Sequence, residues 1–209
     1  LTYTVDYSSP WTYILILMQT HLYTGLFITA HDAMHGTVIP HNQRLNHIIG
    51  RFCTLLFMFN SYKKLFPKHH EHHRHVATDD DPDFHRGNEN FWVWFFHFAK
   101  EYVTIWQILA AAVSFNLLKL ILPTENLILF WIIPSFLSML QLFFFGTFLP
   151  HRGVHEADNR HHSRSQKRNH VLAFLSCYFF GYHYENNDAP GTPWWKLWKT
   201  KEFHEFERL

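Results

Sequence analysis

Residues 126–149 read NLILFWIIPSFLSMLQLFFFGTFL, a run of 24 amino acids without Asp, Glu, Lys or Arg. A helix needs about 20 apolar residues to cross the hydrocarbon core of a bilayer. Residues 11–30 form a second uncharged run of that length, and residues 102–122 form a third apolar run in which Lys119 is the only formal charge. These three runs predict membrane-spanning helices.

Two further apolar segments are too short for a full crossing. Residues 48–59 predict a half-membrane or re-entrant helix, and residues 171–182 predict a buried or interfacial helix. A soluble helical bundle is the alternative, but three such runs are hard to bury in a chain of 209 residues. The sequence therefore predicts an all-α integral membrane protein with three to four membrane helices and short interfacial helices. We expect a single membrane-embedded domain over residues 1–209.

The polar blocks between the apolar runs carry the histidines. Two predicted spans separate residues 63–90 from residues 151–170, so both blocks are expected on the same side of the membrane. Both are also rich in Lys and Arg, which the positive-inside rule assigns to the cytoplasm. Residues 1–10 are polar and lack a basic start, so no signal peptide is expected. The sequence thus predicts a cytoplasmic, histidine-rich helical cap.

The composition restricts the classes of partner and cofactor. A formal net charge of +1 gives no sign of a nucleic-acid partner. Cys53 and Cys177 both lie in apolar runs, without the spacing of a disulfide framework or a thiolate metal site. The 19 histidines, by contrast, are clustered, which points to imidazole as a metal ligand.

The histidines fall into four clusters with ligand-like spacing. His31 and His35 are four residues apart, so their imidazoles share one face of a helix. Alone, such a spacing is also typical of an incidental pair or of a solvated surface helix. The joint occurrence of several clusters at one end of a membrane bundle is what predicts a metal centre. The other clusters are His69 with His72 and His73, residues 151–162, and His183 with the residues after it.

The number of histidines indicates how many ions are held and which metal. Imidazole ligands suit zinc, copper, iron and nickel. A structural zinc site needs only four ligands, whereas more than six candidate imidazoles imply two ions. Two such ions at a membrane surface, beside an interior with 22 Phe and 8 Trp, point to oxygen chemistry on a lipophilic substrate, and hence to iron.

Four stretches of sequence carry a resemblance to a known family. They are YTGLFITAHDAMHG at residues 23–36, ATDDDPDFH at 77–85, LPHR at 149–152 and PWWKL at 193–197. The order of the histidine boxes resembles that of the membrane fatty acid desaturase/hydroxylase superfamily. Within this superfamily, the four stretches resemble the bacterial carotenoid (β-carotene) ketolases, over nearly the whole chain.

The resemblance implies an O2-dependent di-iron oxygenase, a 4-ketolase of carotenoid biosynthesis. Such an enzyme oxidises the C4 methylene of a β-ionone ring to a ketone, turning β-carotene into echinenone and canthaxanthin, or zeaxanthin into astaxanthin. The resemblance also implies two non-haem Fe ions, O2 as co-substrate, and a reduced ferredoxin or similar electron donor. It implies a multi-pass location in the bacterial inner membrane and leaves a homo-oligomer open. The metal ligands that it implies are His31, His35, His69, His72, His73, His151, His161 and His183.

Asp32 is the candidate catalytic-site residue beside these ligands, because a carboxylate that hydrogen-bonds a ligand imidazole fixes its tautomer. A simple charge at a helix end is the alternative. The last box departs from the resemblance, which leads us to expect His-x2-His-His and another His four residues upstream. The chain has Asn186, Asn187 and Phe179 at these positions. Two alternatives to the ketolase therefore stay open: a fatty-acyl desaturase or hydroxylase, and a non-catalytic carotenoid- or metal-binding homologue.

Overall fold

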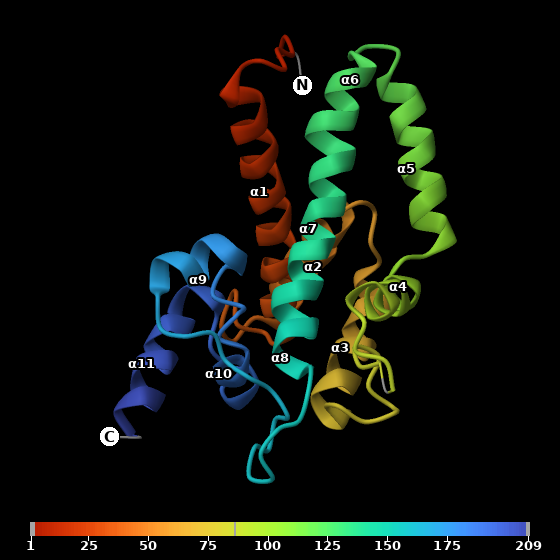
Figure 1. Cartoon of the computed structure of the whole chain (residues 1–209). Helices are drawn as coiled ribbons and strands as arrows, with labels where there is room; N and C mark the ends of the chain where they lie inside the picture. The colour runs from red at the N-terminus through yellow and green to blue at the C-terminus, as the bar shows by residue number, and fades with distance from the viewer. Residues whose placement is uncertain (1–2, 86, 208–209) are drawn as a thin grey trace.

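The computed structural model describes residues 3–85 and 87–207, and within these residues the chain is helical, with no strand. Three rods stand at one end of the molecule, and the shorter helices gather at the other (Figure 1). Two rods are single helices, α1 (Pro10–Met34) and α5 (Ile105–Leu118). The third runs without a break over Thr124–His151. Its parts are α6 (Thr124–Leu127), η1 (Ile128–Ile132), α7 (Ile133–Phe143), η2 (Phe144–Phe148) and α8 (Leu149–His151), where η1 and η2 are π-helical turns.

α1 and the α6–α8 rod are both long and apolar enough to cross a membrane. Large apolar side chains such as Leu17 on α1 and Phe136 on α7 face outward, where lipid can contact them. Between the two rods, the Thr24 hydroxyl lies 3.0 Å from Ser138 Oγ and 2.6 Å from Gln141 Oε1. Such polar pairs between helices contribute to the packing of membrane bundles. The chain is therefore an all-α membrane protein, as the sequence predicts.

The third predicted span, residues 102–122, is broken in the structure. α4 (Phe91–Tyr102) meets α5 at a bend of 84°. At 1.5 Å per residue, the 14 residues of α5 extend for about 21 Å, less than the roughly 30 Å of the hydrocarbon core. The bend lies where Thr104 and Gln107 form a capping box that starts a new helix. Within the described residues, two helices could cross a membrane, or three if the bent pair counts as one span; three is the lower end of the expected range.

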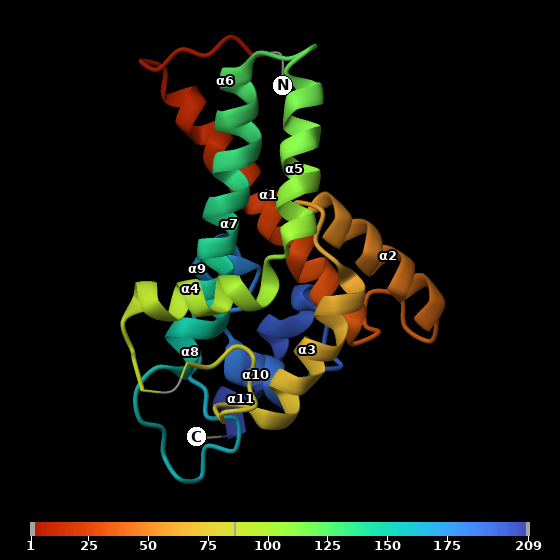
Figure 2. The same cartoon turned by 90° about the vertical axis from the view of Figure 1, so that its right-hand side faces the viewer.

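The remaining helices form the histidine-rich end. The described residues of the blocks 63–90 and 151–170 both lie there, as the count of spans predicts (Figure 2). The two short apolar segments contribute to α2 and α9, neither of which is long enough to cross a membrane. The assignment of residues 1–209 to one domain stays a prediction. The helices of this end are α2 (Gln43–Leu56), α3 (Tyr62–His75), α9 (His170–Cys177), α10 (His183–Asp188), η3 (Trp194–Lys196) and α11 (Leu197–Glu207).

Gly50 lets α2 pack closely against the start of α3. A Cβ on Gly50 would lie 2.1 Å from Cε2 of Tyr62, whose ring is buried against Met34 and Leu65. Gly to Ala within a helix normally stabilises it by roughly 0.5–1 kcal/mol. For Gly50→Ala we expect the opposite effect: overpacking should lower the free energy of unfolding by about 1–3 kcal/mol. The check is a lower melting temperature of the detergent-solubilised protein, with Gly191→Ala as control, because a Cβ there meets no atom within 4 Å.

Candidate metal centre

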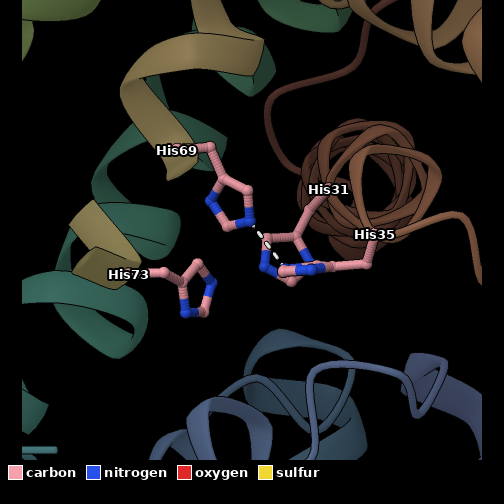
Figure 3. A group of neighbouring side chains, drawn as sticks. All are labelled: His31, His35, His69 and His73. Atoms are coloured by element: carbon pink, nitrogen blue, oxygen red, sulfur yellow. Dashed lines mark hydrogen bonds between the residues drawn. The ribbon is translucent and has the colours of Figure 1, made fainter. Parts of the chain in front are cut away.

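The first cluster of histidines joins the end of α1 to α3. His31 and His35 come from α1 and its C-cap, and His69 and His73 come from α3. One ring nitrogen of each lies within 4.8 Å of those of the others. Figure 3 shows the four rings pointing toward one another between the two helices, with Nε2 of His35 and His69 only 2.7 Å apart. Each helix supplies an i, i+4 pair, so helical periodicity aligns the rings.

The second cluster joins three segments that are far apart in the sequence. His72 comes from α3, His151 ends α8 and His183 starts α10, and all three are buried. Nε2 of His151 lies 3.0 Å from Nε2 of His183. His72 faces this cluster although its neighbour His73 faces the first, because adjacent residues point about 100° apart around a helix. The rings of His72 and His73 are 5.6 Å apart, so the two clusters lie side by side.

Burial keeps most of these imidazoles neutral, which is the form that binds a metal. Burial, with the neighbouring imidazoles, lowers the pKa of His35 to about 2 and that of His73 to about 3. The same causes hold the pKa of His69 and of His183 well below the ordinary value. His72 differs: burial lowers its pKa, but the nearby Asp83 and Asp81 carboxylates raise it above the ordinary value.

Three of the seven imidazoles donate their Nδ1–H to an oxygen behind them. His31 donates to Asp32 Oδ1 at 3.1 Å, and Asp32 Oδ2 also accepts the backbone N–H of Trp194 at 2.7 Å. His151 donates to the backbone oxygen of His162 at 2.9 Å. The third is His72, which donates to Asp81 Oδ1 at 2.9 Å. This arrangement fixes the tautomer and leaves Nε2 free to bind a metal, as in many histidine metal sites.

The residues present fit two metal ions. Nε2 of His31 and of His73 is buried and has no hydrogen-bond partner. Buried polar atoms normally have partners, so these exceptions call for an explanation. Seven converging imidazoles, most of them neutral, form donor sets of four and three for imidazole-binding metals.

A family profile and several relatives match this chain. The profile of the fatty acid desaturase family matches residues 8–106, which include the first five of these histidines. The β-carotene ketolase of Paracoccus sp. (strain N81106 / MBIC 01143) is 42% identical over 185 residues, which are 87% of this chain and 76% of that protein. The chain belongs to the β-carotene ketolase family.

Algal members of the ketolase family are similar too. The zeaxanthin 4-ketolase of Chlamydomonas reinhardtii is 44% identical over 186 residues, which cover 87% of this chain and 42% of that protein. The β-carotene 4-ketolase 3 of Haematococcus lacustris is 39% identical over 191 residues, which cover 88% of this chain and 60% of that protein. The chain thus spans about half the length of these algal relatives. No solved structure matches it significantly.

In this ketolase-family chain, His161 lies outside both clusters. Its Nε2 is 3.0 Å from Asp188 Oδ1, an oxygen that Arg160 also contacts, and Nε2 of His204 is 3.2 Å from Asp188 Oδ2. These contacts tie the loop after α8 to α10 and α11. The assignment of His161 as a metal ligand stays a prediction, and its observed partner is a carboxylate.

The residues that depart from the resemblance at the last histidine box lie in two different environments. Asn186 and Asn187 are buried and line the same cleft as His183. Phe179 instead packs on Phe174 and Tyr182, at ring distances of 5.8 and 6.1 Å. Two of the three positions that depart from the resemblance therefore face the metal centre with a polar side chain.

An apolar cavity of about 300 Å³ adjoins the centre. Its outer wall includes Ile108 on α5 and Phe136 on α7, both exposed on the lipid-facing side. Its inner end meets the cleft between the histidine clusters, which has a volume of about 50 Å³. The residues that line both are Phe27, Phe98, Tyr102 and Leu142.

Two features of the site escape sequence reasoning. The acidic loop at residues 79–83 reads as a solvated turn or as a partner for His75 or His85, yet Asp81 is buried against His72. The second is Phe180, whose ring lies 4.9 Å from that of His31 and 5.4 Å from that of His183. The aspartate cluster that directly follows a histidine box is the available signal for the first, whereas the sequence gives none for Phe180.

Proposed function

We propose that this chain is a carotenoid 4-ketolase, an O2-dependent di-iron oxygenase that acts on the C4 methylene of a β-ionone ring. The observation that carries the proposal is that seven converging imidazoles, four buried and three half-buried, adjoin an apolar cavity in a member of the β-carotene ketolase family. We propose the seven clustered histidines as ligands and Asp32 as the residue that orients His31. The named relatives act on β-carotene or zeaxanthin, and we extend this substrate class to the chain.

The proposed reaction balances over two oxygenations of one carbon. Each consumes one O2, two electrons and two protons, places a hydroxyl on C4 and releases one water. The resulting gem-diol loses water to give the ketone. The bound iron would activate O2, and the electrons would come from a reduced ferredoxin or similar donor.

The protein's own residues would position the ring and exclude water. A β-ionone ring is apolar, so the cavity walls of Phe27, Phe98 and Leu142 offer it the contacts that lipid otherwise supplies. The cleft beyond has a volume of only about 50 Å³, against about 300 Å³ for the cavity, so it leaves little room for water beside the reacting carbon. The reacting carbon would thus reach the centre while the rest of the polyene stays in the cavity or in the bilayer.

We also propose a bacterial inner membrane location with the histidine-rich end in the cytoplasm. The Lys- and Arg-rich blocks at this end support that orientation, and a soluble reduced electron donor would meet the protein there.

The test is expression in cells that accumulate β-carotene, followed by chromatography of the extracted pigments. Echinenone or canthaxanthin is the expected product. Unchanged β-carotene beside folded, iron-loaded protein would contradict the ketolase and leave the acyl-chain oxygenase. Folded protein that holds no iron would favour the non-catalytic homologue, the alternative that Asn186 and Asn187 raise.

A bulky side chain in the apolar cavity should block substrate entry without changing metal binding. Ala111 on α5 lines the cavity, whereas its neighbour Ala112 is exposed and does not. We expect Ala111→Trp to lower ketone yield at least about tenfold, because the added indole occupies space that the substrate needs. Iron content should stay at the wild-type value. Ala112→Trp is the matched control, and an equal loss of yield in both variants would contradict the assignment of the cavity.

A further inference from the structure

The two histidine clusters differ in their number of donors. The first is built from two i, i+4 pairs, one on α1 and one on α3, and has four imidazoles. The second has three, of which His183 on α10 is one. The residue at i+4 from His183 is Asn187, so helical periodicity places its side chain on the same face.

Asn187 is buried without hydrogen-bond partners. Only 7% of the residue is exposed, and neither Oδ1 nor Nδ2 has a partner. Burying an amide without a partner costs roughly 1–3 kcal/mol in proteins. The side chain lines the cleft that His72, His73 and His183 also line. An unpartnered amide oxygen is thus held beside the cluster that lacks a fourth donor.

The position of Asn187 is fixed by a buried ion pair on the same short helix. Glu185 is buried and accepts Lys201 Nζ of α11 at 3.1 Å, and Ser165 also donates to it. The backbone N–H of Ala189 donates to the oxygen of Glu185 and closes the helix. Glu185 is two residues from both His183 and Asn187, about 200° around the helix, so these contacts hold α10 by the face opposite to them.

We propose that Asn187 Oδ1 is the fourth protein ligand of the second metal ion, beside His72, His151 and His183. This inference rests on the proposed function only in taking iron as the ion held. An amide oxygen is neutral and a weaker donor than an imidazole, so the centre is asymmetric. The ion of the second cluster is bound more weakly than the ion held by His31, His35, His69 and His73.

The experiment measures iron release from the full chain, purified in detergent and loaded with Fe(II) without oxygen. A chromogenic ferrous chelator should remove the iron of wild-type protein in two phases, one ion per phase. Asn187→Leu removes the oxygen at similar volume and should leave one ion, released at the wild-type slow rate. Asn187→His supplies an imidazole and should slow the fast phase at least about tenfold, the scale on which site changes alter metal affinity.

Asn126→Leu is the matched control, because Asn126 is a buried asparagine at the opposite end of the bundle that donates to the backbone oxygen of Tyr3. It should keep both phases. Two ions at wild-type rates in Asn187→Leu would overturn the proposal, as would a wild-type chain that holds a single ion. If Asn187→Leu does not fold, an unchanged fast phase in Asn187→His overturns it. The readout does not need turnover, so a chain that binds two ions and forms no ketone contradicts the proposed function alone.

Discussion

Replacing His73 with alanine should abolish ketone formation, to below about 1% of wild type. The expected loss of activity exceeds the roughly 10–100-fold loss that follows mutation of a residue that only hydrogen-bonds a metal ligand. His73 supplies one of four imidazoles of the first cluster, and its Nε2 has no partner other than the proposed ion. Iron content and pigment yield, measured on the same preparation, check the prediction.

His75→Ala is the matched control for His73→Ala. The two residues lie on the same helix, but His75 is exposed and belongs to neither cluster. The control should keep its iron and most of its activity. Equal iron content in both variants would rule out His73 as a ligand.

Replacing Asp81 with asparagine should lower the affinity of the second cluster for its metal by about 10–100-fold. Asp81 accepts the Nδ1–H of His72 and the backbone N–H of Ala77. Burial alone would raise its pKa, but these hydrogen bonds and the one from the Asp83 N–H hold the pKa below the ordinary value. The asparagine keeps the shape and loses the charge that orients His72.

The check on Asp81→Asn is the rate at which a chelator removes the second ion, and Asp80→Asn serves as control. Asp80 is exposed in the same loop and contacts none of the clustered histidines in the structure's described residues. Only the fast phase should change in Asp81→Asn. A change in the slow phase would mean that Asp81 supports the first cluster instead.

Much of this site could be predicted because residues four apart in the sequence lie on the same face of an α-helix. The spacings of His31 with His35 and of His69 with His73 already imply shared faces, and the count of two spans brings the later histidines to the same end. The allocation of rings to clusters could not be predicted. It depends on how α3 is rotated relative to α1 and α10, which decides that His73 meets the first cluster and that His72, about 100° around the same helix, meets the second.

The contacts that escaped prediction lie where the chain is not helical. Asp81 contacts His72, nine positions earlier in the chain, and His161 contacts Asp188 because the loop after α8 folds toward α10. The break of the span at residues 102–122 had a local signal, the Thr104 and Gln107 capping box, which the apolar composition around it obscured. Helical periodicity can be recognised from the local sequence, whereas the path of a loop depends on residues that are distant in the sequence.

The division of donors between the two clusters sets the order in which they are completed during synthesis. In chain order, the last histidine of the first cluster is His73, whereas the last histidine of the second cluster is His183. At 5–20 residues per second, the ribosome needs roughly 5–20 s to make the chain between them. The nascent chain thus contains all four imidazoles of the first cluster before the last imidazole of the second cluster has been made. Metallation of this protein is expected to begin at the first cluster and to finish only after α10 has docked.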